Sequence, residues 1–534
     1  MQRIGIALFV MTVCSLAVMP AYRGQEAAPT RDSWLVVNSA SGQLRGMARP
    51  NGGAEFLGIP YAQPPVGDLR WREPLPVKPW TGVRDATKFG APCAQPILGD
   101  WNKHDAETGN EDCLFLNVIT TVWPPKRPLP VMFWIHGGAN AGGTASSELY
   151  KNGTLVEHGI MLVTANYRLS VFGFFAHPLL TRESLHHASG NYGLMDQIAA
   201  LQWVHDNIAK FGGDPANITV FGQSAGAVDA SLLMVSPRSK DSFQRAIAQS
   251  GSALMSPLRP LAEAEQAGQE LAAALKAPSD DTAIQSLRHL SAPDLLKAIA
   301  ALDPKPSPGA PDLDGWVIPV SPAEVFASGQ QSDIPMIIGT TTREFGSSMS
   351  PDELRKMAHR QVPNSADRVL ALYGLANNDP GTSDPTYGSV ADQLIADWTF
   401  RCPATMQAAL HKAAHRATYE YEFEHAIPGQ EAQGAVHSAD LPYVFGFYPK
   451  SGNISGDFGE VDFKLADLME TYWTDFAKTG NPNGGALPKW PELGSSQLFL
   501  KFTQDGHAVA STSALRQPQC DLYREVQKER TNQH

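Results

Sequence analysis

A short β-branched run leads directly into a Gly-x-Ser-x-Gly pentapeptide, and this stretch constrains the fold more than any other. Residues 218–226 read Ile-Thr-Val-Phe-Gly-Gln-Ser-Ala-Gly, and an Ala-rich helical segment follows. A strand that turns abruptly into a helix leaves no space for side chains beside the turn, so Gly222 and Gly226 keep crowded positions free of Cβ atoms. Ser224 is then exposed at a helix N-terminus, which favours developing negative charge. The stretch predicts a nucleophilic serine, although the pentapeptide alone is short enough to occur by chance.

Continuous apolar runs indicate an α/β fold with a large, mostly parallel sheet. Residues 130–135 read Pro-Val-Met-Phe-Trp-Ile, a run of the kind that is buried on both faces of a parallel sheet. Such runs alternate with helical segments such as 191–211, which ends at a Gly-Gly-Asp-Pro stop. The alternation predicts a doubly wound sheet flanked by helices. The other predicted strands are at 34–45 (a hairpin), 55–57, 114–120, 161–166, 245–248, 335–338, 418–423 and 497–502.

The segment 257–302 is richer in Ala, Leu and Gln than its surroundings. Its periodicity predicts a helical insertion packed on the sheet rather than a separate domain. A Pro-rich linker at 304–311 leads out of it. We also predict helices at 353–373, 390–416 and 462–479.

The first 21 residues have the layout of a secretory signal peptide. One basic residue, Arg3, precedes an apolar run at 4–18 and small residues that end near Ala21. An N-terminal membrane anchor is the alternative, but the run is shorter than the ~20 residues that a spanning helix needs. We therefore expect a secreted or periplasmic protein in which residues 22–534 form a single α/β domain without a membrane span.

Four cysteines follow this leader, an even number that suits an oxidising compartment. Three pairings are possible among Cys93, Cys113, Cys402 and Cys520. We favour Cys93 with Cys113, which closes a loop, and Cys402 with Cys520, which ties the C-terminal tail to the body. Free buried thiols are the alternative. A metal site is not expected, because no Cys-x-x-Cys or His cluster accompanies these residues.

A serine hydroxyl is a weak nucleophile at neutral pH, so it needs a general base and a group that orients the base. In the order Ser, acid, His, the acid follows a buried strand. Glu344 follows the strand at 335–338, whereas Asp333 precedes it, at the wrong end of the sheet. For the base, His437 lies in a small-residue loop without periodicity, and His425, closer to a strand, is the alternative.

Stabilisation of an oxyanion needs two or three backbone N–H groups that point at one position. Gly137-Gly138-Ala139 follows a buried strand and can supply them, with the N–H of Ala225 as a further donor. An ordinary tight turn is the alternative interpretation.

These features together resemble the type-B carboxylesterase/lipase family, the cholinesterase-like branch of the α/β-hydrolases, and within it secreted bacterial carboxylesterases. The likeness runs from about Val36 into the C-terminal region. Its ordered matches are Phe56-Leu57-Gly58-Ile59-Pro60-Tyr61-Ala62, Asn110-Glu111-Asp112-Cys113-Leu114, Gly190-Asn191-Tyr192-Gly193-Leu194-Met195-Asp196-Gln197, Phe211-Gly212-Gly213-Asp214-Pro215, Asp314-Gly315, Phe476-Ala477-Lys478-Thr479-Gly480-Asn481-Pro482-Asn483 and Trp490-Pro491. The resemblance implies an α/β-hydrolase fold and both disulfides favoured above. It also implies a catalytic triad and three oxyanion donors, which are Ser224, Glu344 and His437, and Gly138, Ala139 and Ala225.

The sequence departs from the family pattern beside the reacting centre. The family usually has a third glycine and then an aromatic residue where this chain has Ala139 and Asn140. We infer a roomier, more polar site in which Asn140 faces the substrate. Gln223 stands where cholinesterases carry Glu, and the loss of a buried negative charge disfavours cationic choline esters.

Two further positions are notable. Asp229 replaces a residue that is usually small, and the sequence gives no firm account of it. Trp101 lies between Cys93 and Cys113, roughly where relatives place a tryptophan that faces the substrate. We therefore include Trp101, with Asn140 and Gln223, among the candidate substrate-binding residues.

The function that we predict is serine-dependent hydrolysis of carboxylic esters through an acyl-enzyme, without cofactor or metal. The expected substrates are small to medium esters, including bulky-alcohol or polar ones. A non-catalytic cholinesterase-like binding protein is one alternative; an amidase, carbamate hydrolase or lipase is another. The formal net charge of −12, with no basic stripe, argues against nucleic acid as a partner. The sequence does not determine the oligomeric state.

Overall fold

The computed structural model describes residues 34–50, 52–303 and 310–531. The predicted signal peptide, residues 1–21, and most of the predicted linker at 304–311 lie outside these residues. None of the helices in the described ranges has the length and apolar character of a bilayer-spanning segment.

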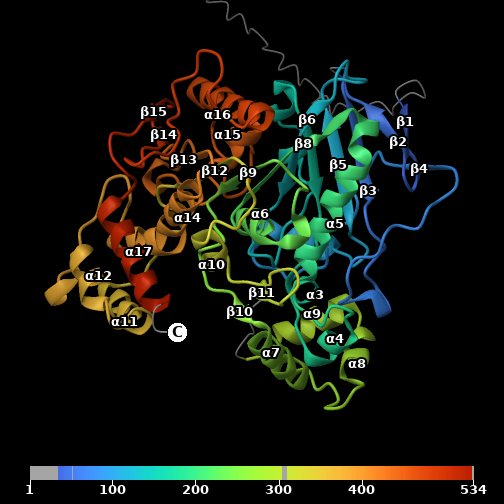
Figure 1. Ribbon diagram of the computed structural model, residues 1–534, viewed down its shortest axis with the longest axis horizontal. Coiled ribbons are helices and arrows are strands. Elements are labelled where there is room, and N and C mark those ends of the chain that lie inside the picture. The colour runs from blue at the N-terminus through green and yellow to red at the C-terminus, as the bar shows by residue number, and fades with distance from the viewer. Residues whose placement is uncertain (1–33, 51, 304–309, 532–534) are drawn as a thin grey trace, which may run out of the picture.

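A large twisted sheet forms the centre of the molecule (Figure 1) and confirms the predicted fold class. In the described part of the chain it has 13 strands in the order β1-β2-β3-β5-β7-β6-β8-β9-β12-β13-β14-β15, with β4 beside β2. Strands β7 to β14 of this order are parallel, and the pairs at both ends of the order are antiparallel, whereas β4 is parallel to β2. The strands are β1 (Trp34–Ser39), β2 (Gly42–Ala48), β3 (Ala54–Pro60), β4 (Val83–Asp85), β5 (Phe115–Thr120), β6 (Leu129–Ile135), β7 (Met161–Ala165), β8 (Gly213–Gln223), β9 (Arg245–Gln249), β12 (Met336–Thr341), β13 (Thr418–Phe423), β14 (Leu500–Phe502) and β15 (Ala508–Ala510).

Strand β6 shows why the central strands are apolar along their whole length. Phe133 and Ile135 point into one hydrophobic core, whereas Met132 and Trp134 point into a second core on the opposite face. Because successive side chains of a strand alternate between faces, burial on both sides requires an unbroken apolar run.

Helices cover both faces of the sheet. Apolar residues of α5, α6 and α14 belong to the first core, and those of α16 belong to the second. The helices outside the insertion are α1 (Lys103–Thr108), α2 (Glu148–Lys151), α3 (Ser170–Gly173), α4 (Pro178–Glu183), α5 (Tyr192–Asn207), α6 (Ala225–Val235), α10 (Pro322–Ala327), α11 (Pro351–Gln361), α12 (Ala366–Leu372), α13 (Val390–Ala396), α14 (Cys402–Ala413), α15 (Leu441–Phe445), α16 (Glu460–Thr479) and α17 (Gln517–Thr531).

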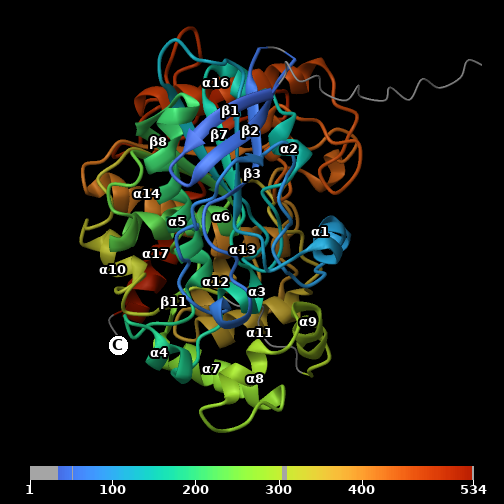
Figure 2. The same cartoon turned by 90° about the vertical axis from the view of Figure 1, so that its right-hand side faces the viewer.

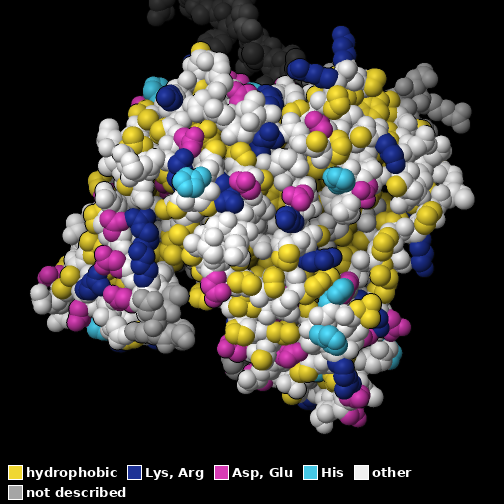
Figure 3. Space-filling model, viewed as in Figure 1, with side chains coloured by type: hydrophobic (Ala, Val, Ile, Leu, Met, Phe, Trp, Pro, Cys, Tyr) yellow, Lys and Arg dark blue, Asp and Glu magenta, His cyan; other side chains and the backbone are white. Residues whose placement is uncertain are grey.

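The predicted insertion is helical and packs on the body. It comprises α7 (Leu261–Ala274), α8 (Ala283–Arg288) and α9 (Ala292–Ala300), and a short parallel pair, β10 (Arg259–Pro260) and β11 (Asp312–Leu313), closes its base. Leu287 and Leu295 belong to the first core. Figures 1 and 2 show these helices beyond the sheet at the bottom of the molecule, and Figure 3 shows the surface hollowed between them and the lobe of α11, α12 and α17.

Two helix predictions need correction. The segment 353–373 forms two helices, α11 and α12, instead of one. The break occurs at Pro363, which lacks an N–H group and restricts the backbone of the residue before it. That residue, Val362, has a φ of −136°, outside the helical range. The segment 390–416 contains α13, a π-helical turn at Asp397–Arg401, and then α14. The π turn brings Arg401 beneath the loop that carries Glu344.

Candidate active site

Ser224 lies at the sharp turn between β8 and α6. Its backbone has φ 58° and ψ −126°, a conformation rare for a residue with a side chain. A Cβ atom at Gly222 would lie 2.4 Å from the backbone of Gly226, and one at Gly226 would lie 2.1 Å from the carbonyl oxygen of Ile135. Both glycines are therefore required, as the sequence predicts, and the turn leaves Ser224 partly exposed.

The structure brings Glu344 and His437 together from two loops beyond the ends of β12 and β13. Nδ1 of His437 lies 2.5 Å from Oε2 of Glu344, and the His437 N–H donates to the Glu344 carbonyl oxygen at 2.8 Å. Oε1 of Glu344 accepts a hydrogen bond from the N–H of Thr341 at 3.0 Å. The buried carboxylate contacts the imidazole through Oε2 and favours a proton on Nδ1, while the backbone hydrogen bond ties the two loops together.

Gln223 contacts the other ring nitrogen of the imidazole and lies next to the candidate nucleophile in the sequence. Its Nε2 lies 3.1 Å from Nε2 of His437, and Gln223 directly precedes Ser224. With a proton on Nδ1, Nε2 of His437 is the acceptor and the Gln223 amide is the donor. In the described part of the chain the Ser224 hydroxyl makes no hydrogen bond to His437. The sequence singled out Gln223 for its lack of charge, but not for this contact.

The glycine loop after β6 lies directly against Ser224, the candidate nucleophile. A Cβ atom at Gly137 would lie 3.0 Å from Cβ of Ser224. Among the described residues, no acceptor pairs with the N–H groups of Gly138, Ala139 or Ala225. Gly138 and Ala139 both have positive φ, 112° and 57°. Unpaired N–H donors in the loop and at the turn of Ser224 are consistent with the predicted oxyanion site.

Asn140 does not lie where we expected it. Its side chain is only 4% exposed, and both of its polar atoms are used inside the protein. Nδ2 donates to Oδ1 of Asp229 at 2.9 Å, and Oδ1 accepts from the hydroxyl of Tyr167 at 3.1 Å. The polar atoms of Asn140 are therefore occupied by partners within the protein and are not presented to a substrate, as a polar wall would require.

Aromatic side chains lie on both sides of the candidate triad. Trp101 is 49% exposed, and its Cη2 lies 3.1 Å from the position of a Cβ atom on Gly138. Phe345 is 51% exposed, and its ring centroid is 4.2 Å from that of His437; the Phe400 ring is 5.1 Å from the same imidazole. The sequence reasoning missed Phe345, although its position directly after Glu344 was a usable signal.

Arg401 supports the loop that carries the acid. It is fully buried and donates from Nη2 to the carbonyl oxygens of Thr342 at 2.5 Å and Thr341 at 3.2 Å. Its charge is balanced by ion pairs with Asp397 and, at 3.3 Å, with Glu422. Burial raises the pKa of Glu422 to about 7, and the nearby guanidinium opposes that shift.

Both favoured disulfides are confirmed. Cys93–Cys113 closes the loop that carries Trp101, and Cys402–Cys520 joins α14 to α17.

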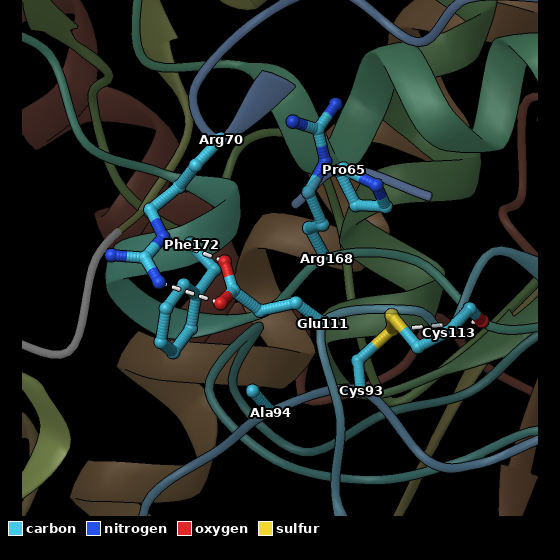
Figure 4. A pocket seen from close by; sticks show the side chains of 8 residues that line it. All are labelled: Pro65, Arg70, Cys93, Ala94, Glu111, Cys113, Arg168 and Phe172. Carbon is cyan, nitrogen blue, oxygen red and sulfur yellow. Dashed lines mark hydrogen bonds and ion pairs between the residues drawn. A yellow bond between two sulfur atoms is a disulfide. The ribbon is translucent and has the colours of Figure 1, made fainter. Parts of the chain in front are cut away.

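A small cavity lies next to the first disulfide (Figure 4). Its volume is about 10 Å³, the space of one water molecule. Arg70 and Glu111 form a bidentate ion pair at its edge, with two contacts of 2.6 Å. No member of the candidate triad lines it, so the cavity belongs to the packing under the Trp101 loop.

Comparisons with known proteins agree with this geometry. The model of the carboxylesterase family matches residues 33–523. The chain is 37% identical to fumonisin B1 esterase of Sphingopyxis macrogoltabida over 514 residues, covering 92% of this chain and 89% of that protein. It is 33% identical to carboxylesterase 1D of Rattus norvegicus, covering 88% and 89%. It is 35% identical to the medium-chain fatty acyl-CoA hydrolase precursor of Anas platyrhynchos, covering 84% of each. The chain therefore belongs to the carboxylesterase family of α/β-hydrolases, and it is a carboxylic ester hydrolase.

Proposed function

We propose that Ser224, His437 and Glu344 carry out this ester hydrolysis. The contact that carries the proposal is the 2.5 Å approach of Nδ1 of His437 to Oε2 of Glu344. The other nitrogen of the same imidazole lies beside Gln223, the residue before Ser224. A serine, a histidine and a buried carboxylate in this order form a proton-transfer chain.

In the reaction, the Gln223 amide releases Nε2 of His437, which then takes the proton of Ser224 as the hydroxyl attacks the ester carbonyl. Such contacts often tighten only when substrate is bound. The N–H groups of Gly138, Ala139 and Ala225 stabilise the tetrahedral oxyanion. His437 then protonates the leaving alcohol, and the acyl group stays on Ser224. Water, deprotonated by the same imidazole, releases the acid.

The proposed substrates are uncharged esters with an apolar group on either side of the carbonyl. The exposed rings of Trp101 and Phe345 support this, because each lies next to a residue of the reacting centre. Gln223 supports the exclusion of choline esters, since a neutral amide offers no charge to a quaternary ammonium group. The relative named fumonisin B1 esterase is a guide to larger esters worth testing.

We also propose that the chain is secreted after removal of residues 1–21, and that residues 22–534 act as one catalytic domain. Two disulfides support an oxidising compartment. N-terminal sequencing of the exported protein tests the cleavage position, and a new N-terminus far from residue 22 would contradict it.

The catalytic assignment is tested by covalent labelling with a fluorophosphonate. We expect wild type to gain one adduct on Ser224 and to lose esterase activity in proportion, whereas Ser224→Ala gains none. Ser231→Ala is the matched control, because Ser231 lies buried on the same helix and contacts Gln407 instead of the triad. An inert wild type would favour a binding protein and contradict the proposal; labelling of Ser224→Ala would place the nucleophile elsewhere.

A further inference from the structure

Asn140 and Asp229 contact each other across 89 residues of chain. Nδ2 of Asn140 donates to Oδ1 of Asp229 at 2.9 Å. Asn140 directly follows the candidate oxyanion donors, and Asp229 lies on α6, five residues after Ser224. Both side chains are buried, at 4% and 0% exposure. The contact therefore ties the oxyanion loop to the helix that begins at the nucleophile.

The pair belongs to a larger network that holds the loop at both ends. Nε2 of Gln197 donates to Oδ2 of Asp229 at 2.6 Å. The hydroxyl of Tyr167 lies 2.8 Å from the carbonyl oxygen of His136 and 3.1 Å from Oδ1 of Asn140. His136 and Asn140 flank residues 137–139, so the network fixes the loop before and after its N–H donors.

The backbone of this loop needs such support. Ala139 and Asn140 are consecutive residues with left-handed φ, 57° and 55°. This conformation is unfavourable for alanine, whereas asparagine tolerates it better, and at Ala139 it persists because the surroundings hold it in place. Burial raises the pKa of Asp229 to about 7, while the hydrogen bonds from Asn140 and Gln197 lower it. Those bonds are strongest to the ionised carboxylate.

We propose that Asp229, acting through Asn140, is a positioning residue for the oxyanion donors Gly138 and Ala139. This inference rests on the proposed function. The side chain of Asp229 does not touch the substrate; it sets where the loop lies relative to Ser224. A shift of the loop moves the donors away from the developing charge, which lowers kcat while KM changes little.

The test exchanges the hydrogen-bond donor Asn140 and the acceptor Asp229, and measures hydrolysis of p-nitrophenyl acetate. Asp229→Ala removes the acceptor, and Asn140→Asp places two carboxylates in contact. We expect each to lower kcat by about 10- to 100-fold, with KM within about threefold, as for a misplaced catalytic group. The double variant N140D/D229N restores one amide and one carboxylate, and we expect kcat within about fivefold of wild type. Ser231→Ala is again the control.

A second readout separates positioning from a loss of folded protein. A trifluoromethyl ketone adds to the serine and forms an oxyanion in the same site, so its inhibition constant should rise in the two single variants and recover in N140D/D229N. Active-site titration with fluorophosphonate corrects every kcat for the folded fraction. If Asp229→Ala does not fold, the comparison of Asn140→Asp with N140D/D229N decides.

Unchanged kcat in the folded single variants, or a folded double variant that recovers neither kcat nor ketone binding, would overturn the inference. Wild type that hydrolyses no ester and takes no label would instead overturn the proposed function. The two failures are therefore distinguishable.

Discussion

Gln223 contacts the imidazole of His437 through its side-chain amide, and replacement of Gln223 by Glu has a defined electrostatic effect. A carboxylate 3.1 Å from Nε2 of His437 favours the protonated imidazole, which cannot act as a base. We expect Gln223→Glu to move the acidic limb of the kcat/KM profile to higher pH by about one unit or more. Measurement between pH 5 and 9 with an uncharged ester tests this, with Gln223→Met as the uncharged control. Coincident profiles for Gln223→Glu and wild type would contradict it.

Asp229 gives the folded state a pH dependence of stability with a definite sign. Burial raises the pKa of its carboxyl from 3.8 to about 7. Between these values the folded state binds a proton that the unfolded state has lost, so this residue's contribution to stability is largest below pH 4 and is lost as the pH rises to 7. Asp229→Asn removes the effect. We therefore expect the difference in Tm, Asp229→Asn minus wild type, to be more positive at pH 8 than at pH 5.

Differential scanning fluorimetry at both pH values measures this. Asp367→Asn, an exposed carboxylate on α12, is the control and should show no pH-dependent difference. A Tm difference for Asp229→Asn that is equal at the two pH values, or larger at pH 5, would contradict the prediction.

The π-helical turn before α14 is an element whose replacement should affect both stability and catalysis. Arg401→Leu leaves Glu422 buried without this cation and leaves Asp397 with Arg516 alone, a change that costs ~3–5 kcal/mol. It also releases the carbonyl oxygens of Thr341 and Thr342, so we expect kcat to fall in whatever folded protein remains. Thermal unfolding and active-site-titrated kinetics test both effects.

Arg368→Leu is the matched control for that variant, because it removes exposed ion pairs on α12, which contribute at most ~1 kcal/mol. Equal losses of stability in the two variants would argue against a supporting role for Arg401.

Elements were predictable from sequence where the signal is local. The apolar run of β6 and the glycines around Ser224 determine the local backbone by themselves, so a few adjacent residues are enough to predict the strand, the turn and the helix. The break at Pro363 was overlooked, although its cause is also local. The π turn and the direction of Asn140 were not accessible in this way. The partners of Asn140, Tyr167 and Asp229, lie 27 and 89 residues away, and only the folded chain shows that they meet.

The two disulfides act on different parts of the molecule, so their removal should have separable effects. Cys402–Cys520 spans 118 residues and Cys93–Cys113 spans 20. Loop-closure entropy gives contributions of ~5 and ~3 kcal/mol. We expect C402S/C520S to lose more stability and C93S/C113S to lose more activity, since the shorter loop holds Trp101. Tm and kcat/KM for an aromatic ester measure the two effects. The prediction would be contradicted if one of the two variants showed both the larger loss of Tm and the larger loss of kcat/KM.

Strands β6 and β8 are paired in parallel, with Ile135 opposite Gly222, and the oxyanion loop and Ser224 follow their respective ends. Backbone pairing of the two strands therefore sets the spacing between Ser224 and the proposed oxyanion donors, and exposed side chains such as Trp101 take no part in that pairing. We therefore expect randomisation of Trp101 and Phe345 by directed evolution to change which esters are accepted, while the strand pairing that places Ser224 is kept. This separation makes the chain a suitable scaffold for selecting new biocatalysts.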